Sequence, residues 1–302
     1  MKNSVKIFLS KWSTKKMANI IDGKKIASKI LSRVKDEMSG LGYKLGLAVI
    51  LIGDHWESKL YIEHKKKTCE KVGINFFLHE FPNTVSQKEI LNLTDELNND
   101  VKVHGILVQL PITASLDLLM IQEAIDPWKD VDGFSPINQG LLFSTKQKIP
   151  LCTVIPPTAL GCLKLIESTG TTIEGKKAVI VGRSNIVSKP IAHLLLQKNA
   201  TITICHSKTQ NLEQETKQAD ILVVAAGQPR LITSRMVKKD VIVIDVGINR
   251  VDKNLIGDVD YEEVKEIASF ITPVPGGVGP MTISCLMENV LFLAKEQKAF
   301  AK

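Results

Sequence analysis

Short apolar runs alternate with helix-length amphipathic stretches along most of this chain, and this alternation constrains the fold more than any other feature. In the first half, predicted strands at 45–52, 74–79 and 103–108 alternate with predicted helices at 24–41, 57–72, 87–98 and 116–124. Strands that alternate with helices pair in parallel through right-handed crossovers. The pattern therefore predicts an α/β fold.

The second half repeats the alternation after a segment without periodicity. Residues 126–150 are rich in Pro, Gly, Asp and Asn, which favours a linker or a site loop. The predicted elements that follow are helix 158–168, strand 178–181, helix 187–198, strand 201–205, helix 212–218, strands 221–225 and 241–246, and a last helix at 281–298. We interpret this half as a nucleotide-binding sheet.

Length and composition exclude several classes of protein. The chain has 302 residues, of which 44% are hydrophobic and 24% are charged, and this ordinary globular usage excludes a disordered or fibrous protein. The length fits one large or two medium domains. No apolar run approaches the ~18 residues that a membrane-spanning helix needs, so we expect a soluble protein with no membrane partner.

The net charge of +7 is concentrated at the N-terminus. Residues 1–16 contain five lysines and no acid, so the remainder carries only +2, too little to favour a nucleic-acid partner. We expect residues 1–16 to be a disordered basic extension ahead of Met17, in a cytoplasmic protein. The alternatives are a partner-binding arm, or a targeting peptide that would place the protein in the mitochondrial matrix.

The number and spacing of the cysteines indicate reduced thiols. There are five, an odd number, with no Cys-x-x-Cys pair and no histidine cluster at the spacing of metal ligands. We therefore predict neither a disulfide scaffold nor a metal site.

A strand leads directly into a turn and a helix at 177–188. The Gly-x-Gly-x-x-Gly fingerprint of dinucleotide-binding proteins is absent: only Gly182 remains, with Ser184 and Ser188 near the other two positions. The free backbone N–H groups of a helix N-terminus can still bind a phosphate, and the Ser184 hydroxyl adds a donor. A plain strand-to-helix turn is the alternative interpretation.

The end of the next strand bears on the choice of cofactor. NAD-specific sheets carry an Asp or Glu there, ~20 residues beyond the first turn, to bind the ribose hydroxyl. In this chain no acid occurs between Arg183 and Glu213. Arg183, Ser207 and Lys208 could instead bind a phosphate. Any dinucleotide cofactor is therefore expected to be NADP.

Lys65 is the most informative residue of the predicted helix 57–72. At 100° per residue it falls within a stripe shared by Ser58, Tyr61, Ile62, Cys69 and Val72. A lysine in a core-facing stripe must extend to solvent, find a partner or lose its proton, and in the last case it becomes a base. Tyr61 stands one turn away on the same face. The neighbouring Lys66 and Lys67 fit a solvated face.

Three further segments are candidate site residues. Gln109 follows the predicted strand 103–108, and ligands bind at the carboxyl ends of parallel strands, although an amide that caps the next loop is equally consistent. Asp132 precedes a glycine and could simply form a turn. The Pro/Gly-rich segment 273–280 could be an interdomain loop, or could let the backbone approach a flat ligand closely.

Taken in order, these residues resemble the bifunctional methylenetetrahydrofolate dehydrogenase/methenyltetrahydrofolate cyclohydrolase family. The resemblance runs from about Met17 to the C-terminal helix. The matching stretches are Ser58-x-x-Tyr61-x-x-x-Lys65, 105–111, 130–134, 181–184, 205–209, 245–250 and 273–282. Each stretch alone is modest evidence, whereas all of them in this order are strong evidence.

The resemblance implies an N-terminal α/β folate-binding catalytic domain and a Rossmann-type NADP-binding domain with a cleft between them, usually in a homodimer. It assigns 17–150 and the C-terminal helix (281–302) to the first domain and 151–280 to the second. The implied activities are the NADP-dependent oxidation of 5,10-methylenetetrahydrofolate to the methenyl form and its hydrolysis to 10-formyltetrahydrofolate.

The resemblance also implies roles for individual residues. Lys65 is the key residue for hydrolysis, Gln109 tunes it, Tyr61 stacks on the folate and Asp132 holds the pterin, which makes these four the catalytic set. The implied substrate-binding residues are Ser58, Tyr61, Asp132, Pro275, Gly276 and Gly277. The implied cofactor-binding residues are Gly182, Arg183, Ser184, Ser207 and Ile248, and no metal is implied.

This sequence departs from the family pattern at three places. Ser188 replaces a glycine of the phosphate turn, 156–161 differs from the usual Pro-Cys-Thr-Pro-x-Gly, and Glu57 stands where a small residue is common. None of these changes removes a residue with an implied chemical role. Two other functions stay open: a dehydrogenase that has lost hydrolysis, against which Lys65 and Gln109 argue, and a nucleotide-sensing or RNA-binding protein that uses the basic extension, against which the nearly neutral body argues.

Overall fold

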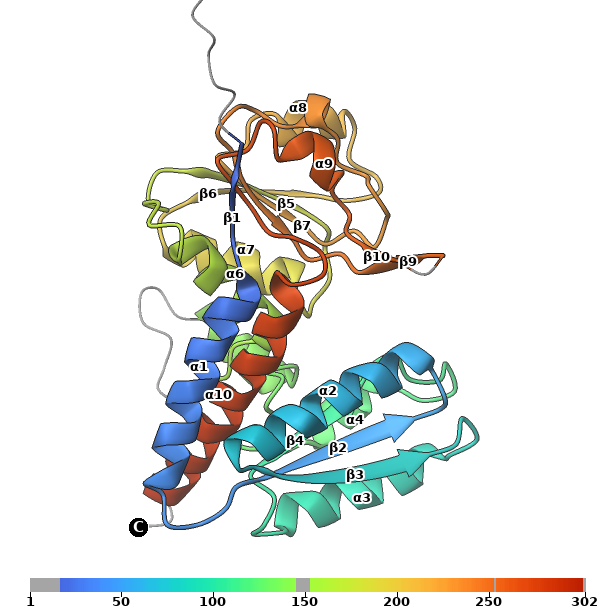
Figure 1. Cartoon of the computed structure of the whole chain (residues 1–302). Helices are drawn as coiled ribbons and strands as arrows, with labels where there is room; N and C mark the ends of the chain where they lie inside the picture. Colours follow the sequence, from blue (N-terminus) through green and yellow to red (C-terminus); the bar gives the residue numbers. More distant parts are fainter. Residues whose placement is uncertain (1–16, 145–152, 253, 301–302) are drawn as a thin grey trace, which may run out of the picture.

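The computed structural model describes residues 17–144, 153–252 and 254–300, which form two α/β domains, each with its own parallel sheet (Figure 1). The two-domain α/β fold predicted from the sequence is confirmed. The extension at 1–16 and Cys152 lie outside the described residues. Within the described part of the chain, no helix is both long enough and apolar enough to cross a membrane.

The first sheet has three parallel strands in the order β3-β2-β4. The central strand β2 (Gly46–Ile52) is buried along its whole length because helices cover both faces, as expected of an apolar parallel strand. The other elements of this domain are α1 (Gly23–Ser39), α2 (Trp56–Val72), β3 (Asn75–Phe81), α3 (Gln87–Asn99), β4 (Gly105–Gln109), α4 (Leu118–Ala124) and α5 (Pro136–Ser144).

The second sheet has six parallel strands in the order β1-β11-β8-β7-β5-β6. Its strands are β1 (Asn19–Ile20), β5 (Lys177–Val181), β6 (Thr201–Cys205), β7 (Ile221–Val224), β8 (Ile242–Asp245) and β11 (Phe270–Ile271). Its helices are α6 (Pro157–Glu167), α7 (Ser188–Gln197), α8 (Leu212–Thr216), η1 (Ser234–Met236) and α9 (Tyr261–Val264). A separate antiparallel hairpin consists of β9 (Asn249–Val251) and β10 (Asn254–Ile256).

The long helix α10 (Val278–Phe300) lies beside α1 and joins the two domains (Figure 1). One continuous apolar cluster contains side chains of α1, α10, α6 and both sheets, so the domains share a core. The carboxylate of Glu288 on α10 pairs with Arg33 of α1 and with Lys164 of α6. These contacts fix the two sheets relative to each other.

Strand β1 requires a correction to the predicted domain boundary. Asn19 and Ile20 pair with Phe270 and Ile271 of β11, so they belong to the second sheet, whereas the predicted first domain contained every residue from 17 to 150. A pair of strands only two residues long leaves no periodicity in the sequence.

Helix α5 lies within 126–150, where the sequence predicted an aperiodic linker or site loop, and this prediction was wrong for Pro136–Ser144. The Asp130 carboxylate accepts hydrogen bonds from the backbone N–H groups of Phe134 and Ser135 and thereby fixes the start of the helix. The Ser135 hydroxyl accepts a bond from the backbone N–H of Asn138, and Pro136 occupies the first helical turn. Serine followed by proline is a local signal for a helix start, and here it outweighs the lack of periodicity.

Asn289 of α10 links the core to the site loop, and we expect its replacement by leucine to destabilise the fold. Its amide donates to the backbone oxygens of Val131 (2.8 Å) and Ile155 (2.9 Å). Leucine would leave both buried carbonyls without these donors, at a cost of about 2–3 kcal/mol in the free energy of unfolding, measured by urea denaturation. The matched control Asn99→Leu, on the exposed face of α3, should change that free energy by less than about 0.5 kcal/mol. Equal effects of the two substitutions would contradict the anchoring role of Asn289.

Candidate active site

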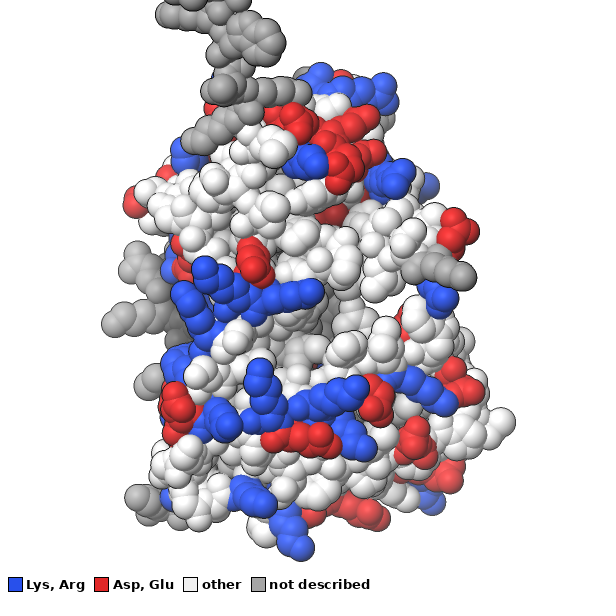
Figure 2. All heavy atoms as spheres, viewed as in Figure 1, with Lys and Arg blue, Asp and Glu red and all other residues white. Residues whose placement is uncertain are grey.

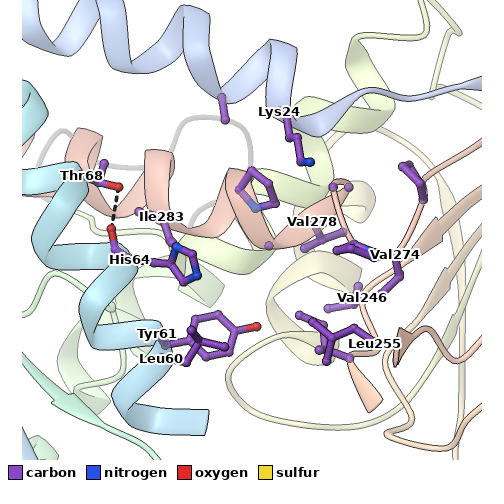
Figure 3. Close-up of a pocket in the computed structure, with 18 of the residues that line it drawn as sticks. Lys24, Leu60, Tyr61, His64, Thr68, Val246, Leu255, Val274, Val278 and Ile283 are labelled. Atoms are coloured by element: carbon purple, nitrogen blue, oxygen red, sulfur yellow. Dashed lines mark hydrogen bonds between the residues drawn. The ribbon is translucent and has the colours of Figure 1, made fainter. Parts of the chain in front are cut away.

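A cavity of about 500 Å³ lies between the two domains. One wall is formed by α1 and α2, and the other by the segment after β8 and the Pro/Gly-rich loop ahead of α10. Figure 3 shows Tyr61 and His64 of α2 pointing into this cavity, opposite Val246 and Val274 of the second wall. The cavity therefore has mainly apolar walls, which suit a flat aromatic ligand.

Lys65 is buried behind the cavity wall, as the helical periodicity predicted. Its side chain is only 8% exposed, whereas its neighbours Lys66 and Lys67 are exposed. The ammonium nitrogen Nζ donates to Oε1 of Gln109 at the end of β4, at 2.7 Å. Burial lowers the pKa of Lys65, and the nearby negative charge of Asp132 opposes this shift.

The Gln109 amide is oriented by the backbone. Its Nε2 donates to the carbonyl oxygen of Leu110 at 2.9 Å, which leaves Oε1 free to accept from Lys65. The same carbonyl accepts from the hydroxyl of Ser58, which is only 2% exposed and lies on α2. Ser58 and Gln109 therefore share one acceptor, and this shared acceptor ties α2 to the end of β4 beside the lysine.

Two aspartates of the 130–133 turn have different environments. Asp130 is buried and accepts bonds at the start of α5, so its role is structural. Asp132 is half-buried, and burial raises its pKa to about 6, while the charge of Lys65 opposes the shift. Burial also raises the pKa of Tyr61, which keeps its phenol neutral. The site thus holds an amine and a carboxyl group whose pKa values lie closer together than in water.

The start of α1 presses against the Pro/Gly-rich loop. The backbone N–H of Lys24 donates to the carbonyl oxygen of Gly276, and a Cβ at Gly23 would lie 1.9 Å from the carbonyl oxygen of Gly277. The glycine at 23 permits this close approach. Pro275, Gly276 and Gly277 consequently line the cavity together with Tyr61.

A contact between the domains crosses the opening of the cavity. The guanidinium carbon of Arg250, in the β9–β10 hairpin, lies 4.5 Å from the ring centre of Trp56 at the start of α2, and both residues line the cavity. Such a cation–π contact at an exposed site contributes about 0.5–1 kcal/mol. Figure 2 shows Lys and Arg side chains on both sides of the hollow in this face. The sequence predicted no role for Trp56 or Arg250, because no sequence pattern shows which residue an aromatic side chain contacts.

The predicted cofactor residues lie at the carboxyl ends of β5 and β6. Gly182 has a φ of +132°, and a Cβ there would lie 2.3 Å from the carbonyl oxygen of Ala225, so only glycine fits. The Ser184 hydroxyl accepts from the backbone N–H groups of Val187 and Ser188 at the start of α7. These geometric details support a ligand-binding turn of the kind found after the first strand of nucleotide-binding sheets.

The remaining predicted cofactor residues are exposed. Arg183 follows β5 and Ser207 follows β6, and the two strands are paired in register, so both side chains stand at the same sheet edge as Gly182. They do not line the interdomain cavity. Ile248 does line it, so the structure divides the predicted cofactor residues between the sheet edge and the cavity.

The described residues hold no cluster of His, Cys, Asp and Glu suited to a metal ion. Cys69, Cys162, Cys205 and Cys285 are free and buried.

The fold and the cavity define a two-domain α/β protein with a dinucleotide-binding domain and an interdomain cleft. Family models match both parts: the catalytic domain of tetrahydrofolate dehydrogenase/cyclohydrolase at residues 21–132 and its NAD(P)-binding domain at residues 156–298. The chain belongs to the tetrahydrofolate dehydrogenase/cyclohydrolase family.

Relatives of known name match nearly the whole chain. The bifunctional protein FolD of Halothermothrix orenii is 52% identical over 280 residues, which cover 91% of this chain and 97% of that protein. FolD of Moorella thermoacetica is 50% identical over 282 residues, 92% of this chain and 99% of that protein. The crystal structure of the Campylobacter jejuni FolD dehydrogenase/cyclohydrolase has a TM-score of 0.89 at 45% identity and covers 93% of this chain and 99% of that one.

The Trypanosoma brucei dehydrogenase-cyclohydrolase, whose structure contains NADP and an inhibitor, has a TM-score of 0.90 at 34% identity, with 94% of this chain and 99% of that chain covered. The prediction of a dinucleotide-binding second domain is confirmed, since the family model that matches it describes an NAD(P)-binding domain.

The buried amine of Lys65 predicts a specific dependence of stability on pH. Because the pKa of Lys65 is lower in the folded than in the unfolded state, the unfolded chain binds more protons between the two values, and stability rises with pH across that window. We expect Lys65→Met to lose this rise and the exposed control Lys66→Met to retain it, as measured by urea denaturation between pH 7 and pH 10. Parallel pH curves for the wild type and Lys65→Met would show that the amine is not desolvated.

Proposed function

We propose that this chain oxidises 5,10-methylenetetrahydrofolate with NADP to the 5,10-methenyl form and hydrolyses that product to 10-formyltetrahydrofolate in the interdomain cleft. The observation that carries the proposal is the buried Lys65 amine, bonded to Gln109 and close to Asp132, behind the wall of a cleft that the dinucleotide-binding domain completes. Family membership and the bifunctional relatives support both activities.

The cleft walls fit a folate. Tyr61 offers an aromatic face on which a ring can stack, and Gly276 and Gly277 offer backbone without side chains in the same cavity. The Asp132 carboxylate can accept hydrogen bonds from the N–H groups of the pterin. Ser58 supports the neighbourhood of the lysine through the Leu110 carbonyl. These roles are proposals for the substrate-binding set.

Lys65 acts as a base in the hydrolytic step. Its pKa is already lowered by burial, and a cationic methenyl ligand beside it would favour the neutral amine further. The neutral amine takes a proton from water as the water oxygen bonds to the methenyl carbon. A C–N bond of the ring then breaks as Lys65 returns that proton to the leaving nitrogen. The hydroxyl of the adduct gives its own proton to water as the formyl C=O forms, so one proton is released overall. Gln109 holds the amine in place through its Oε1.

The sheet edge of the second domain fits NADP, whose nicotinamide ring supplies a hydride acceptor when it is bound. The turn at Gly182 and Ser184 would receive a phosphate, and Arg183 with Ser207 would hold the additional phosphate that distinguishes NADP from NAD. Ile248 would border the cofactor from the cleft.

Two finer points remain proposals from the resemblance. We propose that the protein is a homodimer, and that residues 17–150 other than β1, together with α10, act as the folate domain, while β1 and residues 151–280 act as the cofactor domain. The shared core around α10 supports counting that helix with the first domain as well as with the second.

A dehydrogenase without hydrolysis is the second candidate, and substitution of the lysine separates the two. We expect Lys65→Met to reduce the hydrolysis of methenyltetrahydrofolate by at least about 100-fold, the usual contribution of a positioned base, with unchanged circular dichroism. Lys66→Met, one residue away on the exposed face, should hydrolyse at the wild-type rate.

The assay supplies methenyltetrahydrofolate directly and follows its absorbance, and a parallel assay supplies methylenetetrahydrofolate with NADP. Wild-type protein that forms NADPH without the formyl product would support the single-activity candidate. Protein that forms neither would refute the proposed function.

The raised pKa of Asp132 predicts that kcat/KM for the folate falls at acidic pH. Its carboxylate must be ionised to accept from the pterin, and its pKa is about 6, so kcat/KM for the folate should fall by about tenfold per pH unit well below pH 6. Asp132→Asn should have lower kcat/KM at neutral pH and should lose this acidic limb. An acidic limb that persists unchanged in the variant would assign it to another group.

A further inference from the structure

The second domain buries two carboxylates that the proposed chemistry does not use. Asp245 ends β8 and is 3% exposed, and Asp258, which follows β10, is fully buried. Buried carboxylates are costly unless hydrogen bonds replace the lost water, so their partners show what they hold in place.

The Asp258 side chain accepts from three successive backbone N–H groups. Its Oδ2 accepts from Ala226 at 2.6 Å and from Gly227 at 2.9 Å, and its Oδ1 accepts from Gln228 at 2.9 Å. These three residues form the loop that follows β7. The loop has no regular secondary structure of its own. The Asp258 carboxylate therefore supplies the acceptors that the N–H groups of the loop would otherwise lack.

The same carboxylate holds a second loop. Its Oδ1 also accepts from the side-chain amide of Asn249 at 2.8 Å, and Asn249 directly follows Ile248, which lines the interdomain cavity. A Cβ at Gly247 would lie 2.2 Å from the Asp258 carboxylate, so the turn after β8 lies directly against it. Asp258 therefore links the segments that follow β7 and β8.

Asp245 fixes the position of Asp258 itself. Its Oδ1 accepts from the backbone N–H groups of Asp258 at 3.0 Å and of Gly247 at 3.1 Å, and its Oδ2 accepts from that of Val259 at 3.0 Å. The two carboxylates thus form a rigid unit at the carboxyl edge of the sheet.

The loop held by Asp258 adjoins the predicted phosphate turn. The carbonyl oxygen of Ala225, immediately before the loop, is the atom that excludes a Cβ at Gly182. Ligands of open α/β sheets bind at this carboxyl edge. A shift of residues 226–228 would consequently disturb the floor of the turn at 182 as well as the Ile248 side of the cavity.

We propose that Asp258 is a positioning residue for the cofactor: it holds the loops after β7 and β8 in the conformation that binds NADP, without touching the reacting atoms. The inference rests on the proposed function. Hydrolysis of supplied methenyltetrahydrofolate requires no oxidation, so that reaction serves as an internal control in the same molecule.

The substitution Asp258→Asn tests this role. An amide presents an N–H group toward backbone N–H donors and cannot accept all four bonds, so the loops should lose their shared anchor. We expect the Kd for NADP, measured by calorimetric titration, to rise by at least about tenfold, with hydrolysis of methenyltetrahydrofolate within about twofold of wild type. The KM for NADP in the dehydrogenase assay should rise more than kcat falls.

Asp220→Asn is the matched control. Asp220 precedes the same strand β7 at the opposite, amino edge of the sheet, where its carboxylate accepts from the backbone N–H of Lys177 and from Lys238. This variant should bind NADP with the wild-type Kd. A second variant, Asn249→Ala, removes only the link to the turn after β8 and should raise the Kd by about threefold, which also tests the proposal if Asp258→Asn does not fold.

Wild-type affinity for NADP in Asp258→Asn, or an unchanged Kd in Asn249→Ala when Asp258→Asn fails to fold, would overturn the proposal. Equal loss of hydrolysis and cofactor binding in a folded Asp258→Asn would also overturn it, because the effect would then not be local to the cofactor site. Wild-type protein that binds NADP but forms no folate product would instead refute the proposed function and leave the role of Asp258 supported by the titrations.

Discussion

The burial of the Lys65 amine between α2 and the end of β4 is the interaction on which the site depends. Desolvation disfavours the ammonium form, and the acceptor at Gln109 compensates only part of that cost. The lysine stays in this position because Ser58 and Gln109 both donate to the Leu110 carbonyl, which holds α2 against the end of β4. The fold therefore buries an amine at a cost in stability. Such a cost is typical of catalytic sites.

The two domains share one apolar cluster around α1, α6 and α10, and each domain has a further cluster of its own. Helices α1 and α10 fix the distance between the sheets, while the Arg250–Trp56 contact crosses the open side of the cavity. The shared core is extensive, whereas the cation–π contact contributes only about 1 kcal/mol. Any widening of the cleft should therefore occur on the side of the β9–β10 hairpin, away from the joined helices.

Much of this arrangement could be predicted from the sequence, because the spacing of apolar residues indicates which face of a helix or strand is buried. Long elements such as α2 and β2 were found within a few residues, and the inward position of Lys65 followed from its place in a helical stripe. Helix α5 was missed because the segment lacks apolar periodicity, although Ser135, Pro136 and the nearby acceptor Asp130 mark its start. The anchoring role of Asp258 could not be predicted, because its three backbone partners lie 30 to 32 residues earlier and no local pattern records such a bond.

The pairing of β1 with β11 has a consequence for how the polypeptide is threaded. The described chain contributes a strand to the second sheet before it builds any part of the first, and it returns through α10 to complete the core around α1. Apart from α10, the first domain is thus inserted between β1 and the other strands of the second sheet. No single cut of the backbone would release two intact modules, so excision of either half as an independent fragment would leave an unpaired sheet edge or an uncovered helix.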